Sequence, residues 1–232
     1  IAMLLGPDRS KLSKRHGAAS ISDFRRMGFL PEALVNYLAL LGWSSPTGEE
    51  ILPLPEIKAQ FTLDRVAKSP AIFDLAKLRW MNAQYINKLM PKELAALARA
   101  FLPEEKEDWP KLEQVMAVLQ DELEVLGDLW PRVQLFYELP EKDGQAAKIL
   151  SRPETGAILT AFQEALRGVP EDLTPEEAGE LLHGLPPKLG LGTGKVLRSI
   201  RAALTGAASG PELVQIIAIL GRDECLRRVR LV

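Results

Sequence analysis

The 232-residue sequence has a single cysteine, two histidines and no long apolar run. Cys225 alone can form neither an internal disulfide nor a zinc site, so we expect a protein of the reducing cytoplasm. With only His16 and His183, we expect no histidine-based metal site and no catalytic triad. A membrane span needs about 18 consecutive apolar residues, and this sequence has no such run.

A secretory signal peptide is also missing, and the first residue, Ile1, is not a start methionine. We therefore expect that an N-terminal part of the natural protein, and some of its function, precedes Ile1. The composition is 47% hydrophobic and 26% charged, which is typical of a globular protein. The length suffices for one large domain or for two to three small ones.

The charges are unevenly distributed along the chain. Residues 1–30 carry six Lys/Arg against two acids, and residues 188–232 carry eight against three. The residues between them carry 15 basic and 26 acidic side chains. The basic ends favour contact with a polyanion, which the net charge of −2 conceals. The alternative is that the C-terminal Lys and Arg complement the dipole of a last helix.

Helical periodicity dominates the sequence, and the alternation typical of strands is nearly absent. The fold is predicted to be all-α. Only residues 51–54 read as a short extended piece. Helices are expected over 31–41, 74–89, 91–102, 112–129 with a break or restart at Trp130-Pro131, 145–151, 154–167, 174–184, 193–205, 211–220 and 222–230.

Linker candidates divide these helices into groups. They are the acidic stretch 103–110, the loop 139–144 and the Gly/Pro-rich run 184–194. We expect a short α domain followed by two small helical bundles, with boundaries at 1–88, 89–143 and 144–232.

Lys11, Leu12, Ser13, Lys14 and Arg15 form the most distinctive local motif, which is flanked by glycines. Two lysines three residues apart can place both ammonium groups on one polyphosphate, and the serine hydroxyl adds a donor. From this pentapeptide alone, a solvated basic loop is the favoured interpretation.

The run 190–195 (GLGTGK) invites comparison with a phosphate-binding loop. Leu189 stands where the first glycine of that motif belongs, and Val196 stands in place of Ser or Thr. We therefore favour a plain turn before a helix, although a helix N-terminus can still receive a phosphate.

The C-terminal arginines offer bidentate donors for phosphates or base edges, although most arginines on bundle surfaces pair with acids or remain solvated. Arg198 and Arg201 are three apart on one predicted helix and are expected to face the same way. The remaining candidates are Arg227, Arg228 and Arg230. The tryptophans are expected in the core rather than on stacking platforms: Trp43, Trp80, Trp109 and Trp130. Cys225 is expected to be a half-buried packing residue.

Taken together, four segments in order resemble one family over the whole chain. Residues 6–17, GPDRSKLSKRHG, resemble the KMSKS loop of class I aminoacyl-tRNA synthetases, in the form typical of bacterial glutamyl-tRNA synthetases. The other three segments are similar to the same family: residues 39–43 (ALLGW), residues 73–86 (FDLAKLRWMNAQYI), and the C-terminal pieces 201–206 (RAALTG), 210–213 (GPEL) and 219–221 (ILG).

The resemblance implies an enzyme that activates glutamate with ATP and Mg²⁺ and transfers it to tRNA. The nucleotide-binding catalytic half would precede Ile1, so the chain alone is expected to be inactive and to bind no cofactor. Lys11 and Lys14 would be the catalytic pair, with Lys14 on the ATP, and would stabilise charge on the departing pyrophosphate. A cytoplasmic monomer that binds tRNA, with no DNA and no membrane partner, is the family expectation.

The resemblance also implies that different regions of the chain contact different parts of the tRNA. Residues 1–88 would carry the KMSKS loop and contact the tRNA stem, and 89–143 and 144–232 would form a two-part anticodon-binding cage. Within that cage, Arg201 occupies the position of an anticodon-contacting arginine. Gly210, Pro211 and Leu213 match the loop that packs around anticodon bases. Gly210 departs from the family pattern, which has a polar residue there.

A second departure concerns the third anticodon base. Family members restricted to the glutamate tRNA read this base with an arginine in an earlier helix. That register falls near residues 122–124, which contain two acids and no arginine. The chain is therefore expected to accept the glutamine tRNA as well as the glutamate tRNA.

Two alternatives remain at this point. A class I lysyl-type synthetase shares a helical cage, although the intact 11–17 motif and the 39–43 helix end argue against it. A helical scaffold for protein partners would show an exposed apolar helix face and association that is insensitive to salt. A glutaminyl-type enzyme would need a β-barrel that the sequence does not predict.

Overall fold

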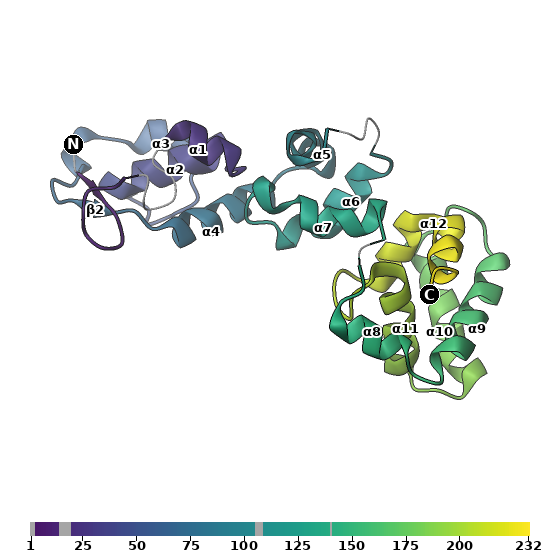
Figure 1. The fold of residues 1–232 in the computed structure, drawn as a ribbon. Coiled ribbons are helices and arrows are strands. Elements are labelled where there is room, and N and C mark those ends of the chain that lie inside the picture. Colours follow the sequence, from purple (N-terminus) through teal and green to yellow (C-terminus); the bar gives the residue numbers. More distant parts are fainter. Residues whose placement is uncertain (1–2, 14–19, 105–108, 140) are drawn as a thin grey trace. The chain divides into compact units, whose positions relative to one another are not determined.

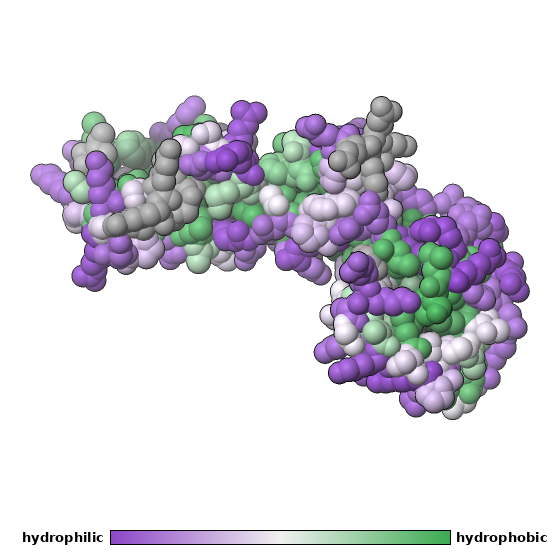
Figure 2. Space-filling view, viewed as in Figure 1, coloured by the Kyte–Doolittle hydropathy of each residue, from purple (hydrophilic) through white to green (hydrophobic). Residues whose placement is uncertain are grey.

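The computed structural model describes residues 3–13, 20–104, 109–139 and 141–232 (Figure 1). They form two compact units. The first unit comprises Ile1–Lys106 and Gln120–Trp130, and the second comprises Glu107–Leu119 and Pro131–Val232. The three-part division expected from the sequence stays a prediction. The visible surface of each unit is mostly hydrophilic, with apolar residues in smaller patches (Figure 2).

The first unit is helical, as predicted. Its described strand structure is one short parallel pair, β1 (Leu4–Leu5) beside β2 (Ala71–Ile72). Its helices are α1 (Ile21–Arg26), α2 (Pro31–Gly42), α3 (Leu54–Gln60), α4 (Leu75–Ile86) and α5 (Pro91–Ala98), with 3-10 turns at Leu63–Arg65, Arg99–Phe101, Gln120–Glu122 and Leu126–Asp128.

Local sequence explains where these helices begin. Ser20 and Asp23 form a capping box at α1, and Pro31 opens α2 at the first helical position. The Asp74 carboxylate accepts from the backbone N–H of Lys77 at 3.0 Å and caps α4.

Buried amides tie the first unit together. The Asn82 side chain accepts from the backbone N–H of Leu30 at 2.8 Å and donates to the carbonyl of Glu124 at 2.6 Å. Gly28 packs directly against the backbone of Leu126 and Gly127, and its carbonyl accepts from Leu126 N–H at 3.1 Å. A Cβ at Gly28 would lie 2.3 Å from the Gly127 nitrogen, so only glycine fits this approach.

The second unit packs helices from its two stretches of the chain. They are α6 (Leu112–Leu119), α7 (Trp130–Tyr137, whose first residue belongs to the first unit), α8 (Gly144–Leu150), α9 (Thr155–Arg167), α10 (Pro175–Leu189), α11 (Thr193–Thr205) and α12 (Leu213–Val229). Their apolar faces bury residues such as Ile158, Phe162 and Ile200. Gly221 has φ 77° and ψ 169° and interrupts α12 where two separate helices were predicted.

Two predicted helix ends were wrong. The single helix expected over 112–129 ends at Leu119 and continues as the 3-10 turn Gln120–Glu122, where the Gln120 side chain donates to the carbonyls of Ile86 and Leu89, both at 2.8 Å. Trp130 then starts a new helix, as expected. Helix α10 continues through Pro186 and Pro187 to Leu189, inside the run that was predicted to be a linker.

The burial expectations were confirmed for two of the four tryptophans, because Trp130 is only partly buried and Trp80 is exposed. Trp43 and Trp109 lie in the core, whereas Trp80 is 44% exposed and the prediction was wrong there. Cys225 is fully buried rather than half-buried. Burial raises the pKa of its thiol to about 12, so it is an unreactive packing residue.

Candidate functional site

The first candidate site is the loop that leads into Lys11. Gly6 N–H donates to the carbonyl of Ser10 at 2.8 Å, and the Asp8 carboxylate accepts from the Ser10 backbone N–H and hydroxyl at 3.0 and 2.8 Å. These bonds and a bridge between Leu5 and Lys11 fix the loop backbone. The Lys11 side chain is exposed. The loop therefore presents a cation from a rigid turn.

The rest of this motif is only partly described. Leu12 packs against the core of the first unit, and Ser13 is half-buried. Lys14 and Arg15 lie outside the described residues, as does His16. That Lys11 and Lys14 act on one polyphosphate stays a prediction.

The second candidate site surrounds Arg201 on α11. Its Nη1 donates to the carbonyl of Pro211 at 2.6 Å, which holds the loop 206–212 against the helix. Gly210 has φ +143°, and a Cβ there would lie 3.7 Å from Nη1 of Arg201. Leu213 is buried beside them at the start of α12. The structure therefore brings all four predicted anticodon residues together.

Two of these residues, Arg201 and Leu213, border a cavity of about 310 Å³, called here the Arg201 cavity. Its lining is Gly179, Leu182, His183, Leu197, Arg201, Glu212, Leu213 and Val214. Burial lowers the pKa of Arg201, but a guanidinium stays charged at neutral pH. Apolar walls with one fixed guanidinium suit a planar base that has polar edges.

The sequence interpretation missed His183 and Glu212 in this cavity. Both side chains can hydrogen-bond a base. In the sequence, His183 is one of only two histidines, and no motif around it indicates a binding role. Its place in the Arg201 cavity could have been found only from the packing of α10 against α11.

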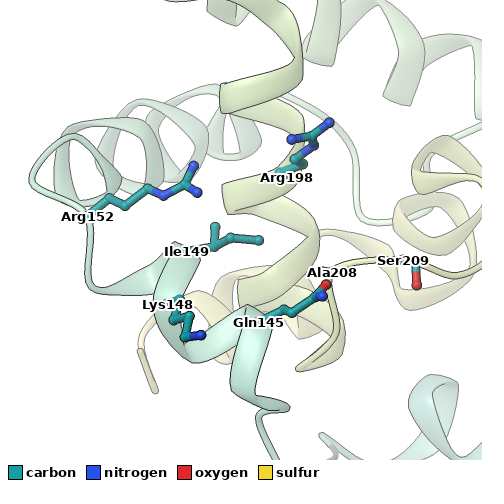
Figure 3. Close-up of a pocket in the computed structure, with 7 residues that line it drawn as sticks. All are labelled: Gln145, Lys148, Ile149, Arg152, Arg198, Ala208 and Ser209. Atoms are coloured by element: carbon teal, nitrogen blue, oxygen red, sulfur yellow. The ribbon is translucent and has the colours of Figure 1, made fainter.

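Arg198 does not share the Arg201 cavity, although both were expected to face the same way. It lines a second cavity of about 380 Å³, called here the cationic pocket (Figure 3). The other residues around it are Gln145, Lys148, Ile149, Arg152, Ala208 and Ser209. A third cavity, of about 420 Å³, lies at the end of α10 and includes His183, Pro187 and Gly190.

Residues 190–192 form a turn that leads into a helix, as predicted, and residues 193–195 are already the first turn of α11. Gly190 closes α10 in the left-handed conformation, and Gly192 precedes the first residue of α11. Lys195 pairs with Glu154 at 3.3 Å. The run thus has an ordinary role in linking α10 to α11.

Residues 122–124, where the family's arginine for the third anticodon base was expected, include Glu124, which forms an ion pair. The Glu124 carboxylate accepts from Arg79 Nε at 2.6 Å, and Arg79 also pairs with Asp128. These hydrogen bonds raise the pKa of Arg79. The Glu124 side chain is still 53% exposed, so the segment presents an acid to solvent.

Two features are missing from the described parts of the chain. They contain no group of three His, Cys, Asp or Glu side chains that could hold a metal ion. None of their helices combines the length and apolarity that a bilayer crossing requires.

Known proteins match the chain in both parts. Residues 93–232 match the family described as an anticodon binding domain, and residues 1–80 match the catalytic domain of class I tRNA synthetases (E and Q). The glutamate–tRNA ligase of Carboxydothermus hydrogenoformans is 42% identical over 238 residues, which cover 99% of this chain and 49% of that protein. The glutamate–tRNA ligase of Desulforamulus reducens is 39% identical over 243 residues, with 99% and 49% covered.

A solved structure agrees with these matches. A glutamate tRNA ligase from Elizabethkingia meningosepticum, in complex with its amino acid, superposes with a TM-score of 0.87 at 27% identity. The match covers 99% of this chain and 49% of that one. The chain thus spans about half the length of the relatives it matches. Over residues 93–232 the chain belongs to the anticodon binding domain family, and over its whole length it is similar to about half of the glutamate–tRNA ligases.

Proposed function

We propose that this chain is the tRNA-binding part of an enzyme that joins glutamate to tRNA with ATP through a glutamyl-adenylate. The observation that carries the proposal is the Arg201 cavity, because it lies inside the anticodon-binding match and combines a fixed guanidinium with apolar walls. We expect a cytoplasmic monomer that binds no DNA.

Arg201 reads a base edge in this proposal. Its Nη1 already holds the carbonyl of Pro211, so the remaining N–H donors are directed by a side chain whose position is fixed. A fixed fork of donors loses little entropy on binding and rejects bases that lack matching acceptors. Pro211 and Leu213 pack against the base.

Lys11 and Lys14 act on ATP in the complete enzyme. Lys11 is exposed on a rigid turn and fits the phosphates of ATP, which carries its own Mg²⁺. The chain spans about half of its relatives and matches the catalytic domain only over residues 1–80, so we expect the chain alone to bind tRNA without aminoacylating it. The segment 1–88 contacts the stem, and 89–143 and 144–232 form the cage.

We further propose that the glutamine tRNA is accepted together with the glutamate tRNA. No arginine occurs in residues 120–130, and Glu124 pairs with Arg79. The segment has no arginine of its own to read the third anticodon base, and the nearby Arg79 guanidinium is held by Glu124 and Asp128.

Binding of the 232-residue chain to glutamate, glutamine and unrelated tRNA transcripts, measured over a salt series, tests the proposal. We expect binding that weakens steeply with salt, with the first two tRNAs within about 10-fold of each other. Arg201→Ala should weaken both by about 10- to 100-fold, since a good bidentate contact is worth about 1–3 kcal/mol.

The matched control is Arg167→Ala. Arg167 is an exposed arginine in the last turn of α9 and lines none of the three cavities. The proposal is wrong if no tRNA binds even at low salt, or if both substitutions have the same effect. Salt-insensitive binding to a protein partner would favour a helical scaffold instead.

A further inference from the structure

The cationic pocket and the Arg201 cavity are both lined by residues of α11 and of the segment 208–213. Arg152 extends from the turn after α8 toward the helix that carries Arg198, and Ile149 lies near both (Figure 3). Lys148 adds a third cation, and Gln145 and Ser209 add neutral hydrogen-bonding groups. No acid lines this pocket.

Its cations are unpaired. Lys148, Arg152 and Arg198 make no side-chain hydrogen bond or ion pair with any residue in the described ranges. The acid closest to them in sequence, Glu154, is taken by Lys195 at 3.3 Å. Three like charges around one hollow repel each other, and an anion would relieve that repulsion.

One short loop separates this pocket from the Arg201 cavity. Ala208 and Ser209 line the cationic pocket, and Glu212 and Leu213 line the Arg201 cavity. On α11, Arg198 and Arg201 are three residues apart; Arg198 lines the cationic pocket, and Arg201 lines the Arg201 cavity. Because both cavities are lined by α11 and by residues 208–213, a polymer with a charge on each unit can contact both of them.

We propose that the cationic pocket binds backbone phosphate of the RNA strand whose base occupies the Arg201 cavity. Arg152 and Arg198 donate to the phosphate oxygens, and Lys148 adds a point charge. A phosphate contact sets the register of the strand and carries no sequence information, which leaves the reading of bases to Arg201. This inference rests on the proposed function.

The test compares the double variant Arg152→Gln/Arg198→Gln with a control that removes two charges elsewhere in the second unit, Arg167→Gln/Arg230→Gln. All four side chains are exposed, so both variants should fold as the parent does, which circular dichroism checks. Binding to glutamate, glutamine and unrelated tRNA transcripts is measured over a salt series.

The double variant should bind all three tRNAs about 10-fold more weakly and by the same factor. The slope of log K against log salt should become shallower by about 1 to 2, since each phosphate contact contributes about 0.7–0.9 to it. The control should keep its slope within about 0.3 of the parent value. Arg201→Ala, in contrast, should alter the preference among the three tRNAs.

Methylphosphonates, introduced one at a time into the anticodon loop of a glutamate tRNA stem-loop, identify the contact. At one or two positions, the neutral linkage should weaken binding of the parent chain but not of the double variant. Equal losses in both proteins at every position would overturn the inference, as would a double variant that behaves like the control. If the parent binds tRNA and Arg201→Ala weakens it, such a result leaves the proposed function intact. If the parent chain binds no tRNA, the proposed function and this inference are both wrong.

Discussion

Two groups of arginines in the second unit differ in what surrounds them. Along α12, Arg227 pairs with Glu224 at 2.6 Å, and Arg222 pairs with Asp223 at 2.9 Å. Around α8 and α11, Arg152 and Arg198 have no such partner among the residues described. An arginine whose donors are already used stabilises the fold, whereas one that faces a hollow without an acid has its donors available to a ligand.

Arg228 is the extreme member of the first group. It is fully buried, and its Nη1 donates to the carbonyls of Leu135 and Leu204 at 2.5 and 2.8 Å. Its Nε pairs with Glu224 at 2.7 Å, while Nη2 has no hydrogen-bond partner in the described structure. This guanidinium links the ends of α7, α11 and α12.

The largest effect is therefore expected for Arg228→Met. The substitution leaves two carbonyls without their donor and should lower the free energy of unfolding by about 3 kcal/mol. Urea denaturation measures this, with Arg198→Met as the matched control, which should change stability by less than about 0.5 kcal/mol. Equal losses in both variants would remove the distinction between the two groups.

Charge-conserving substitutions sharpen the comparison between the two cavities. Arg201→Lys keeps the charge but loses the planar fork, so discrimination against an unrelated tRNA should fall by about 10-fold. Arg198→Lys can still hold a phosphate and should weaken binding by less than about 3-fold. Competition binding with matched transcripts measures both, and a larger effect from Arg198→Lys would reverse the assigned roles.

Low pH should reduce the stability that the ion pairs of Glu224 on α12 contribute. Hydrogen bonds from Arg227 and Arg228 lower the pKa of Glu224 below its ordinary value. The stability that Glu224 contributes is complete above that ordinary value and is lost as the pH falls through the lowered one. Urea denaturation between pH 7 and pH 3 should therefore show a smaller loss for Glu224→Gln than for the parent chain. The same loss in both would contradict this assignment.

The smallest effect is expected for Arg227→Gln. The Arg227 side chain is 55% exposed, and its bond to Glu224 spans three residues on one helix. Such a pair contributes about 0.3–0.5 kcal/mol, because water screens it. Denaturation of this variant in low and high salt should show that the difference from the parent chain shrinks with salt. A loss comparable to that of Arg228→Met would show that exposure does not separate the two arginines.

Helix starts were predictable because their signals lie within a few residues. Thr174 and Glu177 form the expected capping box at α10, and Pro31 opens α2. The end of α6 was not predictable. Directly after α6, the Gln120 amide donates to the carbonyls of Ile86 and Leu89, which lie more than 30 residues earlier, and no local signal in the sequence indicates these contacts.

In the candidate site, too, some residues could be predicted from the sequence and others only from the tertiary structure. The sequence by itself identified the family and predicted four residues, Arg201 among them, that the structure brings together, since ordered motifs over the whole chain are specific even without coordinates; it did not identify His183 and Glu212. Only the tertiary structure decided that Arg198 and Arg201 line different cavities, because this depends on which residues of other elements surround each side chain. It also decided that Arg228 is a core residue, because burial depends on which helices meet around a side chain and not on its neighbours in sequence.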